Sequence, residues 1–370
     1  MDNLNTLIQD AIALLKEMIS IPSFSKEEDR VASCIESFLN KRNITTHRLS
    51  NNVYALNHAF NTNKPTIVLN SHHDTVKPAK GFDTDPFIPT VIDNKLIGLG
   101  SNDAGGPLVA LIATFLFYHY EQELPFNLCL IASAEEEISG KNGIELLLND
   151  EVFQNRISGS IIIGALVGEP TKMEMAVAER GLLVIDAIAN GQAGHAAREE
   201  GINAIDIALK DIAKINNIVF DKISPLTGKT TAKVTVIETD NKAHNVVPAS
   251  CKFVIDIRVN EYYSFEEIIS SIQSSVSSQL QARSFRLRST MIDMNHPIVS
   301  AGKKLGLPHY GSPTTSDKAL MPFPALKIGP GDSSRSHTAN EYILLDEIAA
   351  GIKGYINLIK ETALQIQQLN

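Results

Sequence analysis

Three short apolar runs in the first half of this chain are each followed by acidic or imidazole side chains. The runs, with the polar residues that follow them, are Thr66–Leu69 with His72 and Asp74, Asn127–Ala132 with Glu136 and Glu137, and Ile161–Ile163 with Glu169. Apolar runs of this length bounded by polar residues are typical of buried strands. In open α/β sheets, ligands gather beyond the carboxyl ends of the strands. The pattern therefore predicts a sheet with a binding or catalytic site along one edge.

Helical and strand patterns alternate around these runs. The chain opens with an amphipathic helix that begins at Leu4, and Ser25 to Glu28 is interpreted as a capping box for a second helix. Helical patterns follow at 108–120 and 143–148, and a last one spans 346–368. This order is that of a three-layer α/β domain with a largely parallel sheet.

Two loops add further candidate ligands. Asp103 lies in a turn-rich stretch that leads into the helix at 108–120, and His337 lies in a loop rich in Gly and Ser. Taken singly, each candidate has an ordinary interpretation, because acidic residues after strands are usually solvated and Asp103 could be only a helix N-cap. Taken together, carboxylates and two imidazoles suit zinc or a similar divalent ion, and one shared carboxylate can hold two ions. The five candidate metal ligands are His72, Asp103, Glu137, Glu169 and His337.

The sequence pattern changes between about residue 181 and residue 290. Strand, helix, strand, strand, helix and strand patterns follow one another there, at 182–189, 202–216, 233–238, 252–259, 265–281 and 284–289. The order β-α-β-β-α-β is ferredoxin-like α+β. Since His337 must return to the other ligands, we expect residues 181–290 to be an inserted domain and residues 1–180 and 291–370 to form the catalytic domain.

On these motifs the chain resembles the co-catalytic zinc amidohydrolases, a family that includes acetylornithine deacetylase, succinyl-diaminopimelate desuccinylase, aminoacylase and glutamate-type carboxypeptidases. The resemblance covers essentially all 370 residues. It implies two Zn²⁺ ions per subunit, with Co²⁺ as a possible substitute. One ion would be held by His72, Asp103 and Glu169, and the other by Asp103, Glu137 and His337. In one departure, Ala104 to Pro107 stand where the family often has Met-Lys-Gly-Gly.

The resemblance also implies roles for other residues. Asp74 would support His72, and Glu136 would be the general base that acts on a water between the metals. The inserted domain would form a homodimer and send His195 into the partner's active site. Asn245 and Arg258 would contact the substrate, the arginine through bidentate bonds to a carboxylate. For Asn245 taken alone, a turn residue is the simpler interpretation.

The expected reaction is deacylation of a small-molecule N-acyl amino acid. The stretches 98–105 and 133–140 resemble those of enzymes that act on N-acetyl-ornithine or N-acetyl-citrulline in arginine biosynthesis. A succinyl-diaminopimelate or succinyl-ornithine desuccinylase, or a dipeptidase, is the alternative, and Arg335 could then pair with a succinyl carboxylate or simply be a solvated loop residue. A catalytically silent, metal-stabilised binding dimer is a third hypothesis, but it would be expected to lack Glu136 or a ligand.

Composition narrows the expected partners and location. A net charge of −9 without a basic cluster argues against nucleic acid as a partner. The apolar stretches fall short of the roughly 18–20 residues of a membrane span, and the first residues lack the basic start of a signal peptide. Three scattered cysteines are interpreted as buried thiols, which favours a cytoplasmic protein.

Overall fold

The computed structural model describes residues 4–369 of the chain, so Met1 to Asn3, on which the signal-peptide expectation partly rests, lie outside the described residues. The chain divides into two compact units. The first runs to Val177 and resumes at Ile292–Tyr310 and from Ser316, and the second comprises Ala178–Met291 with Gly311–Thr315. Among the described residues, no helix has the length and apolar character needed to cross a membrane.

The largest sheet has nine strands, and its middle strands β6, β3, β7 and β17 run parallel. Antiparallel strands flank them on both sides. The order along the sheet is β1 (Thr46–Leu49), β2 (Asn52–Leu56), β6 (Asn127–Ser133), β3 (Thr66–His72), β7 (Ile162–Val167), β17 (Ala325–Lys327), β8 (Met175–Glu179) and β15 (Thr290–Met291), and β16 (His309–Ser312) also pairs with β8. All residues of β3 and β6 are buried, because helices cover both faces.

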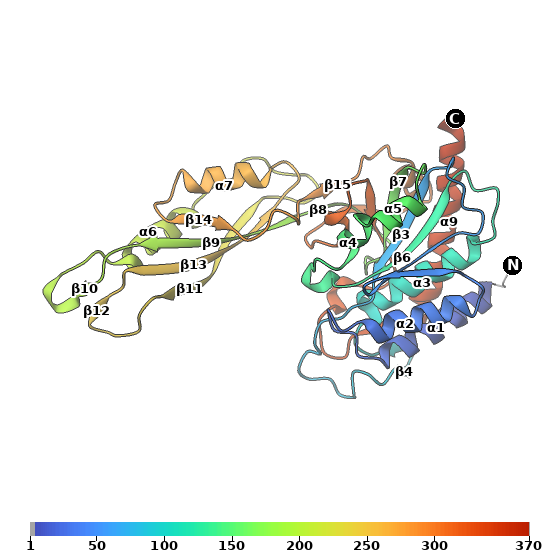
Figure 1. The fold of residues 1–370 in the computed structure, drawn as a ribbon, viewed down its shortest axis with the longest axis horizontal. Helices are drawn as coiled ribbons and strands as arrows, with labels where there is room; N and C mark the ends of the chain where they lie inside the picture. Colours follow the sequence, from blue (N-terminus) through green and yellow to red (C-terminus); the bar gives the residue numbers. More distant parts are fainter. Residues whose placement is uncertain (1–3, 370) are drawn as a thin grey trace. The chain divides into compact units, whose positions relative to one another are not determined.

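Helices form the outer layers of the first unit (Figure 1). On one face, α3 packs on β3 and β6 and against the long helix α9. On the other face, Val68 and Ile131 of the sheet belong to one core cluster with Ile144 of α4 and Phe153 of α5. The helices of this unit are α1 (Leu4–Ile19), α2 (Asp29–Asn40), α3 (Gly106–Tyr118), α4 (Ile144–Leu148), α5 (Glu151–Arg156), α8 (Pro297–Lys304) and α9 (Leu345–Leu369). The expected three-layer α/β architecture with a largely parallel sheet is confirmed.

A small antiparallel sheet lies beside this core. It consists of β4 (Thr90–Ile92), β5 (Lys95–Ile97) and β18 (Tyr342–Leu344), in the order β18-β5-β4. Its register places Tyr342 opposite Ile97. The pairing therefore brings the segment after His337 next to the segment that leads into the Asp103 loop.

The capping-box prediction for the second helix was wrong. Helix α2 begins at Asp29, and its N-cap residue Glu28 makes no side-chain cap. The Ser25 hydroxyl instead donates to Asp74 at 2.7 Å, and the Glu28 carboxylate accepts from the amides of Lys26 and Glu135 at 2.6 and 3.2 Å. Both side chains are used in tertiary contacts, which the local motif does not reveal.

The second unit is a four-stranded antiparallel sheet in the order β11-β13-β9-β14. Its main elements are β9 (Gly181–Asn190), α6 (Ala204–Asn216), β11 (Thr231–Thr239), β13 (Ser250–Val259), α7 (Phe265–Gln273) and β14 (Gln279–Ala282). Alternate residues of β9 are buried and pack, with Ala208 of α6 and Ile268 of α7, in one core cluster. The expected ferredoxin-like β-α-β-β-α-β order is confirmed.

Two elements in this unit have bounds that differ from the prediction by more than two residues. The helix expected at 265–281 ends at Gln273, and the last strand is Gln279–Ala282 rather than 284–289. Serine side chains compete with helical backbone hydrogen bonds, and a serine-rich stretch follows Gln273. The amides of Ser277 and Ser278 donate instead to the buried Asp211 carboxylate, at 2.9 and 2.8 Å.

Candidate metal centre

Six side chains come together beyond the carboxyl ends of three neighbouring strands. Strands β6, β3 and β7 are adjacent and parallel, so these ends meet at one edge of the sheet. His72 ends β3, Glu136 and Glu137 follow β6, Glu169 follows β7, Asp103 lies in the loop before α3, and His337 lies in the loop after β17. Five of the six are the ligands expected from sequence, and Glu136 is the expected base.

His72 lies at one side of this group. Its Nε2 atom is 3.3 Å from Oδ1 of Asp103, 3.8 Å from Oε1 of Glu169 and 3.9 Å from Oε2 of Glu136. The side chain is only 1% exposed. Burial opposes protonation of His72, but the carboxylates around it, Glu136 first among them, outweigh burial and raise its pKa well above the ordinary value. A positive charge is thus strongly favoured at this point, which is the electrostatic character of a cation site.

His337 lies at the other side. Its Nε2 atom is 3.0 Å from Oε2 of Glu137 and 3.7 Å from Oδ2 of Asp103. The hydrogen bond with Glu137 raises the pKa of His337 to about 9. The two oxygens of Asp103 therefore face different histidines, and this carboxylate is shared between two ligand groups. Ligand atoms of His72, Asp103 and Glu137 also lie within 4.8 Å of one another.

Asp74 contacts both His72 and the loop that carries Glu136 and Glu137. Nδ1 of His72 lies 3.0 Å from the backbone oxygen of Asp74 and 3.4 Å from its Oδ1. The Asp74 carboxylate also accepts the amides of Glu136 and Glu137, at 3.0 and 3.1 Å. Burial alone would raise the pKa of Asp74, but hydrogen bonds from His72 and Ser25 lower it. An ionised Asp74 can therefore orient both the imidazole and the acidic loop.

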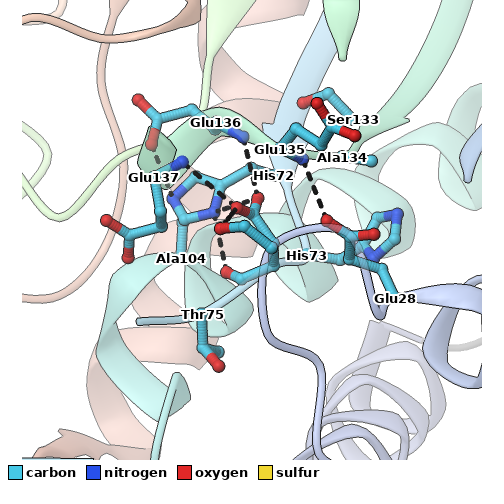
Figure 2. A network of polar contacts seen from close by, with 12 residues as sticks. Glu28, His72, His73, Thr75, Ala104, Ser133, Ala134, Glu135, Glu136 and Glu137 are labelled. Carbon is cyan, nitrogen blue, oxygen red and sulfur yellow. Dashed lines mark hydrogen bonds and ion pairs between the residues drawn. The ribbon is translucent and has the colours of Figure 1, made fainter. Parts of the chain in front are cut away.

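Three consecutive glutamates on this loop point to different partners. Glu135 turns away, and its carboxylate accepts from the side chain and the amide of Asn142 at 2.8 and 3.2 Å. Figure 2 shows its amide directed at Glu28. Glu136 points toward His72, and burial, together with nearby carboxylates, raises its pKa well above the ordinary value. A buried carboxyl group with a raised pKa is suited to proton transfer.

Glu341 belongs to the site but was missed by the sequence analysis. Its carboxylate accepts the amides of Gly100, Asn102 and Asp103, each at 2.9 Å. Burial and the charge of Asp103 raise the pKa of Glu341 to about 7. An acidic residue just before a short strand gives no pattern that marks it as buried, so only the tertiary structure reveals this contact.

The residues expected from the inserted domain lie in the second unit. His195 is on β10 (Gly194–His195), which pairs with β12 (Val246–Val247), and the amide of Ala196 donates to the backbone oxygen of Asn245 at 3.1 Å. The structure therefore brings the exposed residues His195 and Asn245 together. Arg258 lies near the end of β13, where it forms two bonds to Asp256, at 2.9 and 3.1 Å.

The Arg335 side chain contacts two residues of its own chain. Its guanidinium donates to both oxygens of Glu347, at 2.7 and 3.0 Å, and lies 4.5 Å from the ring centroid of Tyr342. The side chain is 17% exposed. Arg335 is therefore a partly buried, ion-paired residue rather than a solvated one, and its expected contact with a substrate carboxylate stays a prediction.

Comparisons with known proteins agree with the geometry. Residues 68–361 match the model of the peptidase family M20/M25/M40. The chain is 28% identical to a [LysW]-lysine/[LysW]-ornithine hydrolase of Sulfurisphaera tokodaii over 95% of both chains, and 26% identical to a succinyl-diaminopimelate desuccinylase of Zymomonas mobilis over 74% of both. A dinuclear metal-binding peptidase of Bacillus subtilis shares the fold, with a TM-score of 0.71 and 14% identity over 96% of this chain and 98% of that chain.

Proposed function

Because the chain belongs to the peptidase family M20/M25/M40, and is thus a metal-dependent amide hydrolase, we propose that it removes the acyl group from an N-acyl amino acid. The proposed substrate is N-acetyl-ornithine or N-acetyl-citrulline. The observation that supports metal-dependent hydrolysis is the position of Asp103, which has one oxygen toward His72 and the other toward His337.

The donor set fits two divalent ions. His72, Asp103 and Glu169 would hold one ion, and Asp103, Glu137 and His337 would hold the other. Imidazole and carboxylate donors suit zinc, and Co²⁺ accepts the same ligands. When bound, such a pair of ions lowers the pKa of water and polarises a carbonyl group.

The chain's own residues would handle the protons. The carboxylate of Glu136 would take a proton from the attacking water and deliver it to the departing amine. Its raised pKa makes it a stronger base for the first of these steps. Asp74 would keep Glu136 in place through the loop amide. The products are a carboxylic acid and a free amino acid.

We assign the second unit, expected at residues 181–290, to dimer formation. β11 is an edge strand, and its residues Val236 and Ile237 are 44% and 49% exposed, which suits pairing with a second copy. His195 would reach the partner's site and donate to the carbonyl oxygen as negative charge develops. Asn245, which lies beside His195, would contact the substrate from the same loop region.

An acetyl group is favoured over a succinyl group because of Arg335. A succinyl carboxylate needs a cationic partner, and Arg335 is already bonded to Glu347 through both oxygens. The Arg258 side chain is 38% exposed, against 17% for Arg335, so Arg258 would exchange Asp256 for the α-carboxylate that every such substrate carries. The similarity to a succinyl-diaminopimelate desuccinylase favours a desuccinylase as a second candidate. The similarity to a [LysW]-lysine/[LysW]-ornithine hydrolase supports ornithine as the amino acid.

We also propose a cytoplasmic location and a role in arginine biosynthesis. The location rests on Cys34, Cys129 and Cys251, which are buried free thiols of the kind found in reducing compartments. The pathway rests on the proposed ornithine or citrulline product.

A substrate panel tests the proposal. The zinc-loaded protein would be assayed with acetyl-ornithine, acetyl-citrulline, succinyl-ornithine and succinyl-diaminopimelate. We expect kcat/KM to be highest for an acetylated substrate. Succinylated substrates that turn over at least tenfold faster would replace the deacetylase assignment with the desuccinylase, and no turnover of any N-acyl amino acid would contradict both.

A further inference from the structure

The Glu341 carboxylate is buried against the backbone of the Asp103 loop. The residue is 2% exposed, and its two oxygens accept three amides of this loop. Its own backbone oxygen accepts the amide of Gly98 at 3.0 Å. Glu341 is therefore bonded to the loop through side chain and backbone, only four residues after His337.

The loop also reaches back toward the His337 segment. The Asn102 side chain accepts the amide of Asp332 and donates to its backbone oxygen, each at 3.0 Å, and it lies 3.4 Å from the Ser336 hydroxyl. Contacts thus run in both directions and lie on both sides of His337. Two segments more than 200 residues apart in sequence are fixed to each other at the point where each supplies a ligand.

The backbone of Asp103 depends on this contact. Its φ of −120° and ψ of 99° are not helical, although α3 begins only three residues later. The amide of Asp103 donates to Glu341 rather than to a helical or strand partner. A carboxylate that accepts backbone amides forms charge-assisted bonds, which are shorter and stronger than neutral ones. Removing an acceptor would leave buried amides without a partner, which is costly.

We propose that Glu341 is a positioning residue that sets the separation between Asp103 and His337 and thereby the affinity of the ion those two residues share. This inference rests on the proposed dinuclear site. Asp103 would bridge two ions, so its position relative to His337 decides whether the second ion finds all of its ligands at once. Residues that support ligands in this way commonly change metal affinity about 10–100-fold when they are replaced.

The side-chain chemistry indicates which variants are informative. Glutamine has nearly the shape of glutamate, but its NH₂ group is a donor and would face at least one backbone amide that also donates. Aspartate keeps two acceptor oxygens on a side chain one methylene shorter. We therefore expect Glu341→Gln to have the larger effect and Glu341→Asp a smaller one. Glu347→Gln is a matched control, since Glu347 accepts the Leu344 amide and binds Arg335 without contacting the Asp103 loop.

The test is a Co²⁺ titration of chelator-treated full-length protein, followed by calorimetry and by visible absorption. We expect the wild type and Glu347→Gln to bind two ions per chain with equal affinities in both proteins. In Glu341→Gln the first ion should bind as in the wild type and the second about 10–100-fold more weakly. Glu341→Asp should lie between them.

The outcomes separate this inference from the proposed function. If the wild type binds no ion, the dinuclear site itself is wrong. If the wild type binds two ions and Glu341→Gln binds both with unchanged affinity, or loses both equally, the positioning role is wrong. Should Glu341→Gln fail to fold, Glu341→Asp decides by the same criterion, because a selective loss at the second ion supports the role and an unchanged or uniform loss contradicts it.

Discussion

The backbone amides of Glu136 and Glu137 both donate to the Asp74 carboxylate, at 3.0 and 3.1 Å, yet their side chains point to different histidines. Glu136 lies 3.9 Å from His72, and Glu137 lies 3.0 Å from His337. One buried carboxylate thus places two neighbouring acids beside two different histidines. Figure 2 shows these side chains leaving the loop in different directions.

We predict that mutation can separate the roles of Glu136 and Glu137. Glu136→Gln should keep both metal ions and lose turnover by roughly 10²–10⁴-fold, the usual contribution of a proton-transfer group. Glu137→Gln should lose metal, since it removes a negatively charged metal ligand beside His337. Metal analysis of both purified proteins, with kcat measured under zinc saturation, provides the check. A metal-depleted Glu136→Gln beside a fully loaded Glu137→Gln would reverse the two roles.

The metal-free protein should lose stability as the pH rises from about 7 to 9. The pKa of His337 is raised to about 9 in the folded state, against about 6.5 in an unfolded chain. The folded state therefore binds more protons in this window, and its stability falls as the pH rises through it. The melting temperature of chelator-treated protein should drop over this range, and less so in His337→Gln. A flat or rising profile in the wild type would contradict the ion pair with Glu137.

Much of the fold and the positions of the candidate ligands could be predicted, because local sequence patterns indicate both. The apolar runs that become β3, β6 and β7 are continuous because helices cover both faces of the sheet. Since ligands lie where such strands end, His72, Glu137 and Glu169 stand out in the sequence as polar residues at the ends of buried strands.

The supporting contacts could not be predicted in the same way. Glu28 and Glu341 are buried because backbone amides from distant segments surround them, and no periodicity in the sequence records this. Ser25 and Glu28 even form a plausible local motif, which the structure does not use. The end of α7 at Gln273 was missed because Asp211, far away in sequence, captures the amides that follow it.

Trans action of His195 can be tested by subunit exchange. Homodimers of His195→Ala and of Glu136→Gln should each be nearly inactive. After mixing and re-equilibration, a heterodimer would contain one site with a native Glu136 and a native His195, so activity should return. Exchange can be verified with a tag on one variant. Verified exchange without any rescue would argue that His195 does not act across the dimer.

Arg335→Ala should affect stability rather than substrate preference. The bidentate pair with Glu347 and the contact with Tyr342 are partly buried, so their loss should cost about 1 kcal/mol of unfolding free energy. The ratio of kcat/KM for acetyl-ornithine to kcat/KM for succinyl-ornithine should stay within about twofold of the wild-type ratio. This is well under the tenfold change that corresponds to about 1.4 kcal/mol. A selective loss of succinyl-ornithine turnover would instead place Arg335 in the substrate pocket.

Metal removal and restoration test the dinuclear amide-hydrolase assignment most directly. Protein stripped by a chelator would be titrated with Zn²⁺, while bound zinc per chain and hydrolysis of the best substrate from the panel are followed in the same samples. We expect no hydrolysis in the stripped protein and a return of activity as the bound zinc approaches two ions per chain. Full activity of the stripped protein, or a chain that binds no zinc, would contradict the assignment.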